Sequence, residues 1–376
     1  MTWTWKFFRN LHLVASVVFS LFATAVGISG SALVFREEIE HAIYEPRVSP
    51  GPARVPLEAL LATAAAVEPA RRVSMAVLPE DASRTVEFIL QKKDARTLKD
   101  ADQMSVYVNP YTGAIEGSRR REASPIARLR DLHFAFFSGT PGLTFNGYVA
   151  LALVFLSLTG LVLWIVASPK NLRFRLSLGG NWKSVLWNMH RQTGLIFLTL
   201  LIVVSITGAY YAFRDTFLKG IHAVTGSLPP RGSPPLTPSA DGSLPGTLDE
   251  IAVAARAVLP EARLAVLRIP SQKTQAWAAT FHREGDSGES TDSGPTAFID
   301  PFTLKAVRID DPRAMPLGAR LVKSMEPVHY GKFGGAPVKC LWVVLGLMPL
   351  MFSMSGAIMW WNRTGGLRPA RRTAPK

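Results

Sequence analysis

Four of the seven histidines form two matched pairs along the chain. A shift of 178 residues relates His12 to His190, and a shift of 196 residues relates His133 to His329. A neutral imidazole offers one ring nitrogen as a ligand to a transition metal. If the two members of a pair lie at the same depth on opposite sides of a symmetry axis, their rings can bind one metal ion from opposite sides.

Similar shifts relate other residues of the two halves of the chain. Further matches at shifts of 178, 191 and 196 residues are Phe19/Phe197, Gly30/Gly208, Phe35/Phe213, Arg36/Arg214, Leu57/Leu248, Pro69/Pro260, Pro79/Pro270, Pro110/Pro301, Gly160/Gly356 and Trp164/Trp360. The shifts differ by 13 and 5 residues, as loop insertions would produce. They therefore predict an internal duplication.

The elements that must position the histidines are membrane spans. A span needs about 20 apolar residues, and we expect transmembrane helices at 8–35, 143–167, 190–214 and 338–362. The long segments 36–142 and 215–337 each show a helical pattern followed by alternating strand-like runs, which predicts a small α+β domain. The predicted fold is a membrane protein with four transmembrane α-helices from a parallel internal duplication. Each half would run helix, extramembrane domain, helix.

The net charge of +14 is concentrated beside the spans. Segments 1–12, 168–191 and 362–376 contain 12 basic residues and no acidic residue, whereas the remainder has 30 basic and 28 acidic residues. Basic residues beside spans mark the cytoplasmic side. We therefore expect both termini, the loop 168–189 and the tail 363–376 in the cytoplasm of a bacterium. The two polar domains would lie in the periplasm, with inner-membrane lipid as a partner and no nucleic acid.

The two histidine pairs are suited to haem. Haem iron takes one axial ligand on each face, so two pairs could hold two haems, one near each side of the membrane. The candidate iron ligands are His12, His190, His133 and His329, and the glycines that would let a flat ring approach a helix are Gly30, Gly208, Gly160 and Gly356. Candidate partners of the propionates are Arg9 and Arg191 at the inner haem and Arg128, Arg130 and Lys332 at the outer one. Copper or zinc bound by the four histidines is the chemical alternative.

Common cofactor and hydrolase motifs are missing from the sequence. It contains no GxGxxG after a strand, no P-loop and no HExxH. The single cysteine, Cys340, excludes an internal disulfide and cysteine-ligated clusters. An electron donor would therefore be a separate cytoplasmic protein or a membrane quinol.

The histidine in the first span, the span ends SLTGLVLW and SMSGAIMW, and the turn NPYTG resemble the PepSY-associated transmembrane proteins over residues 5–365. Within that family the chain looks most similar to the inner-membrane ferric-siderophore reductases of the ferrioxamine (FoxB-like) type. The resemblance implies two PepSY-like periplasmic domains and two haem b groups held by His12, His190, His133 and His329. It also implies reduction of a ferric siderophore, of the hydroxamate type. The second turn, DPFTL, lacks the glycine of the first.

The sequence thus predicts a transmembrane electron conduit that reduces a ferric chelate outside the membrane. Electrons would enter near His12 and His190 and leave from the haem at His133 and His329. Docking of the chelate is expected between the outer haem and the PepSY-like domains, without identified residues. The alternative is a non-enzymatic envelope protein, peptidase-modulating or sensory, in which the spans are anchors and the histidines are interfacial.

Overall fold

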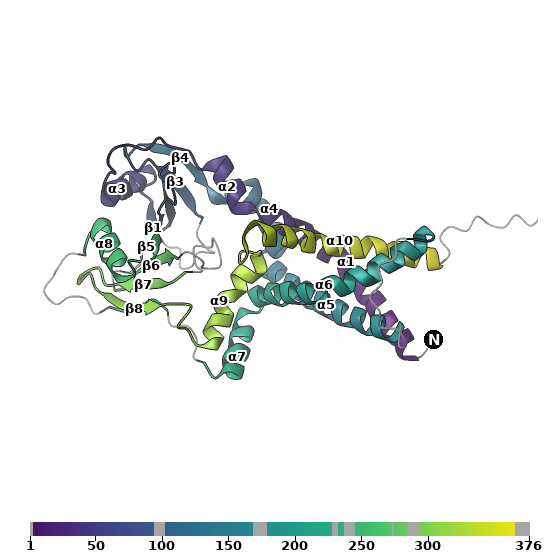
Figure 1. The fold of residues 1–376 in the computed structure, drawn as a ribbon. Helices are drawn as coiled ribbons and strands as arrows, with labels where there is room; N and C mark the ends of the chain where they lie inside the picture. Colours follow the sequence, from purple (N-terminus) through teal and green to yellow (C-terminus); the bar gives the residue numbers. More distant parts are fainter. Residues whose placement is uncertain are drawn as a thin grey trace, which may run out of the picture.

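The computed structural model describes residues 3–93, 102–167, 179–227, 232–236, 245–272, 274–283 and 294–364 (Figure 1). Four long apolar helices are α1 (Trp3–Leu33), α5 (Gly139–Ala167), α6 (Trp182–Ala212) and α10 (Gly335–Thr364). Each is long and apolar enough to cross a membrane. Helix α1 packs against α5 and α10, and α6 packs against the same two helices. Helices α1 and α6 therefore occupy opposite corners of a four-helix bundle.

Helix α6 begins eight residues earlier than the sequence predicts. The side chain of Asn181 accepts a hydrogen bond from the backbone N–H of Ser184 at 3.0 Å and so caps the first turn. This turn carries polar residues, so its hydropathy is low and the sequence pattern predicted a loop there. As a result, His190 lies in the third turn of a helix and not at its mouth. The rest of the predicted loop, 168–178, and residues 365–376 of the predicted tail lie outside the described residues.

Beyond one end of the bundle lies one eight-stranded antiparallel sheet (Figure 1). The first half of the chain contributes β1 (Arg71–Val77), β2 (Val86–Lys92), β3 (Met104–Val108) and β4 (Ile115–Arg120). The second half contributes β5 (Arg263–Arg268), β6 (Trp277–His282), β7 (Thr296–Ile299) and β8 (Ala306–Asp310). The strand order is β4-β3-β2-β1-β5-β6-β7-β8, so β1 and β5 pair at the centre.

The two domains expected from the sequence are therefore joined into one sheet. Each half alone would leave β1 or β5 as an edge with unpaired backbone groups, and their pairing satisfies both edges. Helices α3 (Leu57–Val67) and α8 (Leu248–Val258) share one apolar core with the sheet, and the largest fully buried side chains of this core include Phe88 and Phe281.

Helices α3 and α8 also cap each other. The carboxylate of Asp249 in α8 accepts hydrogen bonds from the backbone N–H groups of Leu57 and Glu58, at 2.8 and 2.9 Å. In return, Glu58 accepts one from the N–H of Leu248 at 2.6 Å. Each carboxylate thus satisfies free N–H groups of the other helix and lies at its positive end. The two halves are fastened together where their helices begin.

Shorter helices connect the sheet to the bundle. They are α2 (Arg36–Tyr44), the 3-10 turn η1 (Arg121–Ala123), α4 (Pro125–Ala135), α7 (Arg214–Thr225) and α9 (Leu317–Tyr330). Helix α4 packs against α1, and α9 packs against α6. Left-handed residues end both helices, Phe136 after α4 and Gly331 after α9. The chain then turns into α5 and α10, so α4 and α9 lie against the outer end of the bundle.

Candidate functional site: two histidine pairs in the helix bundle

The pair nearer the sheet domain, called the outer pair, consists of His133 in α4 and His329 in α9. Each of these histidines is docked on a long helix. Nδ1 of His133 lies 2.9 Å from the carbonyl oxygen of Val26 and 3.3 Å from Oγ of Ser29 in α1. The second histidine makes the matching contacts in α6. Its Nδ1 lies 3.1 Å from the carbonyl oxygen of Val204 and 3.0 Å from Oγ1 of Thr207. The short helices therefore bring both outer histidines into the bundle.

The two outer rings lie close together in the bundle. Their centroids are 6.2 Å apart and their planes are tilted by 50°. An imidazole nitrogen binds a metal at about 2 Å and lies about 1.1 Å from its ring centre, so two imidazoles on opposite sides of one metal have centroids about 6.2 Å apart. The observed separation matches that of two rings bound to one metal ion.

The hydrogen bonds also define which ring nitrogen is bare. The carbonyl oxygens of Val26 and Val204 only accept hydrogen bonds, so Nδ1 of each outer histidine carries the proton and donates it. Burial lowers the pKa of His133 and of His329, so both rings are neutral at physiological pH. A neutral ring protonated on Nδ1 has its lone pair on Nε2. Within the described residues neither Nε2 atom has a hydrogen-bond partner, so each is free to act as a ligand.

In the inner pair, His12 of α1 and His190 of α6, each Nδ1 contacts a hydroxyl of a neighbouring long helix. Nδ1 of His12 lies 2.9 Å from Oγ1 of Thr159 in α5, and Nδ1 of His190 lies 2.7 Å from Oγ of Ser355 in α10. Both hydroxyls donate their own hydrogen to carbonyl oxygens of their helices. They therefore accept from Nδ1–H, which again leaves the lone pair on Nε2.

The four predicted glycines lie beneath the four histidine rings. A Cβ at Gly30 would come within 2.8 Å of Cε1 of His133, and a Cβ at Gly208 within 3.2 Å of Cε1 of His329. At Gly160 and Gly356 the corresponding distances to the inner rings are 3.6 and 3.9 Å. The flat rings that approach these glycines are therefore imidazoles. The outer two glycines are required by close approach, whereas the inner two leave room for a methyl group.

The pairs lie at two levels of the bundle. His12 and the docking carbonyl of Val26 are 14 residues apart on α1, as are His190 and Val204 on α6. At about 1.5 Å per residue this corresponds to about 21 Å along the bundle. The apolar core of a bilayer is about 30 Å thick, so the two levels can lie near its opposite faces.

The predicted propionate partners have other contacts in the structure. Arg9 hydrogen bonds to Asn10 and stacks on Trp5, and Arg191 lies over the rings of Trp164 and Trp187. At the outer level Arg128 is exposed, and Arg130 lies 3.8 Å from Asp131. Lys332 is buried and pairs with Glu37 of α2 at 2.6 Å. This ion pair, together with that between Lys339 and Glu38, ties α2 to the start of α10.

Sequence reasoning missed the residues that hold the rings. Each span carries a hydroxyl residue directly before the glycine beneath a histidine, in the pairs Ser29-Gly30, Thr159-Gly160, Thr207-Gly208 and Ser355-Gly356. The recurrence of a Ser/Thr-Gly pair at matched positions could have indicated them. Sequence reasoning also missed the two tyrosines beside His329, because nothing in the sequence indicates that Tyr211 lies close to His329 and Tyr330. Tyr211 lies 5.6 Å from that ring and stacks on Tyr330, with centroids 6.3 Å apart.

The fold and the site define a multi-pass membrane protein with two pairs of half-buried histidines among its spans and a sheet domain at one end of them. Within the described residues, no group of three or more histidine, cysteine, aspartate or glutamate side chains is placed to hold a metal ion. The chain belongs to the family described as the PepSY-associated TM region, whose model matches residues 9–363. The resemblance to this family noted from the sequence is thereby confirmed. No characterised protein gives a significant match to the chain.

Proposed function

We propose that this protein is a di-haem b electron conduit of the bacterial inner membrane. It would take electrons from a cytoplasmic protein or a quinol and reduce a ferric siderophore in the periplasm, which releases Fe(II). The observation that carries the proposal is the outer pair, whose rings lie 6.2 Å apart with both Nε2 atoms free. At a second level of the bundle the inner histidines are also held through Nδ1, in each case by a hydroxyl group.

The donor set favours haem over copper or zinc. Each level offers two imidazoles, and haem iron needs only two ligands from the protein because its macrocycle supplies four nitrogens. Zinc sites usually draw three or four ligands from the protein. The four histidines would hold the haem iron, and Thr159, Ser355 and the carbonyls of Val26 and Val204 would fix the orientation of their rings. Such contacts set the direction and basicity of a metal-bound imidazole.

We infer that the two halves arose by parallel duplication and are related by a pseudo-two-fold axis along the membrane normal. The matched docking residues support this, because Val26, Ser29 and Gly30 hold His133 as Val204, Thr207 and Gly208 hold His329. Basic segments beside the spans support a cytoplasmic location for both termini. The sheet domain and the outer pair would then face the periplasm.

Bound haem would supply reversible one-electron chemistry between Fe(III) and Fe(II). The chain's own residues would hold the two groups about 21 Å apart along the helices and exclude water between them. Apolar side chains fill the interior between the levels, among them Leu201, Leu345 and Phe352. At the outer surface one electron would reduce the Fe(III) of a hydroxamate chelate. Hard oxygen ligands bind Fe(II) less tightly, so the metal would leave as Fe(II).

The first experiment is the spectrum and metal content of the full-length protein purified from haem-sufficient cells. We expect a low-spin haem spectrum with two haems per chain, and one in His190→Ala. His41→Ala, which changes an exposed histidine of α2 outside both pairs, should retain two. A colourless protein would contradict the conduit and favour a non-enzymatic envelope protein, whereas bound copper or zinc would favour the other metal sites.

Reduction of a chelate is tested separately. Dithionite-reduced protein is separated from excess reductant and mixed with ferrioxamine and a ferrous-specific chelator. We expect reoxidation of the haem together with formation of the ferrous complex. Haem that stays reduced would remove the siderophore assignment and leave the haem sites standing.

A further inference from the structure

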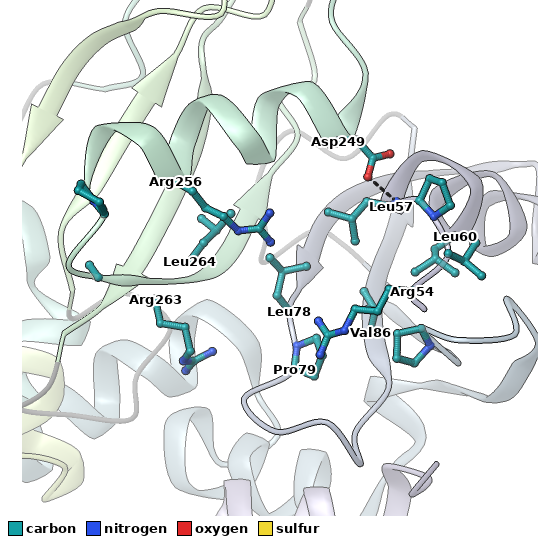
Figure 2. Close-up of a pocket in the computed structure, with 15 residues that line it drawn as sticks. Arg54, Leu57, Leu60, Leu78, Pro79, Val86, Asp249, Arg256, Arg263 and Leu264 are labelled. Atoms are coloured by element: carbon teal, nitrogen blue, oxygen red, sulfur yellow. Dashed lines mark hydrogen bonds between the residues drawn. The ribbon is translucent and has the colours of Figure 1, made fainter. Parts of the chain in front are cut away.

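We propose that a cavity between the two halves of the sheet domain binds a small ligand that carries two or more carboxylates on an apolar body. The cavity has a volume of about 840 Å³ and lies where α3, α8, β1 and β5 meet (Figure 2). Cavities of about 300–1,000 Å³ suit one ligand of drug-like size. Helices α3 and α8 are at the end of the sheet domain away from the bundle (Figure 1). The site is therefore separate from the histidine pairs.

The charge of the cavity indicates an anionic ligand. Arg54 approaches from the segment before α3, Arg256 from α8 and Arg263 from the start of β5. Figure 2 shows the guanidinium groups of Arg54 and Arg256 directed toward the same gap, with Arg263 at its edge. Arg263 lies 3.6 Å from Glu80. In the part of the chain that the structure describes, neither of the other two arginines pairs with a carboxylate, and Arg54 lies only over the ring of Tyr111. The three arginines are exposed at the rim of the cavity, where a bound anion would offset their like charges.

The acidic residue of the cavity lining does not provide that anion. Asp249 uses both carboxylate oxygens to accept hydrogen bonds from the N–H groups of Leu57 and Glu58. Its charge is therefore directed at the start of α3, which is itself a positive helix end. The cavity keeps an excess of positive charge.

The arginines are not part of what joins the two halves. At the shift of 191 residues that relates α3 to α8, Arg54 matches Pro245 and Arg256 matches Ala65, and only Arg263 has a basic counterpart, Arg72. The contacts that fasten the halves, by contrast, come from the matched residues Glu58 and Asp249. The cluster draws Arg54 from the first half and Arg256 and Arg263 from the second, and most of it has no counterpart at the positions that the shift relates to it. This is expected for a binding site and not for a repeated packing contact.

The lining specifies the ligand further. Guanidinium groups bind carboxylates through two parallel hydrogen bonds, which favours planar acids. Leu60, Leu78 and Leu264 supply apolar surface beside the charges. A simple anion would leave this surface exposed to water, whereas an acid with an apolar body would cover it. The volume of about 840 Å³ favours a single small molecule over an extended peptide.

The test is calorimetric titration of the full-length protein in detergent at low ionic strength, with benzene-1,3,5-tricarboxylate as the probe. We expect binding that Arg54→Gln and Arg256→Gln each weaken at least ten-fold, because a charge-assisted pair is lost. Arg320→Gln removes an exposed charge from α9 and should change the affinity less than two-fold. The uncharged tricarboxamide should not bind.

Four results would overturn the proposal. The first is no binding of the tricarboxylate, and the second is binding that the two cavity variants leave unchanged. The third is equal affinity for inorganic sulfate, which would reduce the cavity to a general anion site. The fourth is tighter, arginine-dependent binding of a glutamate-rich peptide, which would assign the cavity to an acidic peptide. None of these depends on haem, so the proposed conduit is unaffected by the outcome.

Discussion

Substitution of Gly30 by alanine tests whether the outer histidine needs the space that a glycine leaves. The new Cβ would lie 2.8 Å from Cε1 of His133, whereas carbon atoms in contact are about 3.5–4.0 Å apart. The ring must therefore move by about 0.7 Å or more. This movement disturbs its 2.9 Å hydrogen bond to Val26 and the separation from His329. At Gly356 the new Cβ would lie 3.9 Å from His190 and require no movement, which makes Gly356→Ala the matched control.

The two variants should differ in stability and in haem content. Overpacking costs about 1–3 kcal/mol, and alanine in place of a helical glycine gains about 1 kcal/mol. Gly30→Ala should then lower the free energy of unfolding by up to about 2 kcal/mol, whereas Gly356→Ala should leave it unchanged or raise it by up to about 1 kcal/mol. Thermal unfolding and haem per chain measure both effects, and we expect Gly30→Ala alone to lose or perturb the outer haem. Two unperturbed haems and an unchanged melting temperature in Gly30→Ala would refute the reasoning.

Three further changes test other contacts of the site and the fold. Thr159→Val removes the acceptor of His12 Nδ1–H and should weaken haem retention by about 10–100-fold. Thr159→Ser keeps the hydroxyl and should retain haem as the wild type does. Haem loss to apomyoglobin measures both. Burial opposes the charge of Glu37, but its ion pair with Lys332 outweighs burial and lowers the pKa of Glu37. The stabilisation is therefore complete above about pH 4.3 and is lost as the pH falls through the lowered value. As the pH falls through that range, the melting temperature of the wild type should approach that of Glu37→Gln. Asp249→Ala removes a helix cap and should cost about 1–2 kcal/mol in unfolding free energy, with no change in haem content.

The spans and the histidine pairs could be predicted from the sequence because both depend on patterns along the chain. Twenty apolar residues form a helix in lipid regardless of what lies beside them, since every backbone group must be satisfied internally. The matched positions of the histidines follow from the same alignment that relates the spans. The start of α6 was misjudged for a related reason. Hydropathy detects lipid contact and not helicity, so a capped polar turn before His190 was taken as loop.

The contacts between distant segments could not be predicted in this way. Nothing in either half indicates that β1 and β5 pair, because an edge strand has the same local pattern whether or not another strand covers it. Lys332 was expected near a propionate because it follows His329 closely, yet it pairs with Glu37, which is 295 residues away. Such pairs depend on how helices cross, and the sequence gives no direct sign of that.

The histidine pairs also explain how one helix can set both levels of the proposed conduit. Helix α1 supplies His12 to the inner pair and, 14 residues later, the carbonyl of Val26 that holds His133 of the outer pair. Helix α6 does the same with His190 and Val204. The separation of the levels is thus the rise of a continuous helix, about 21 Å, and does not depend on a loop or on the sheet domain. A change in the sheet domain can then alter access to the outer pair while the spacing along which electrons would travel stays fixed.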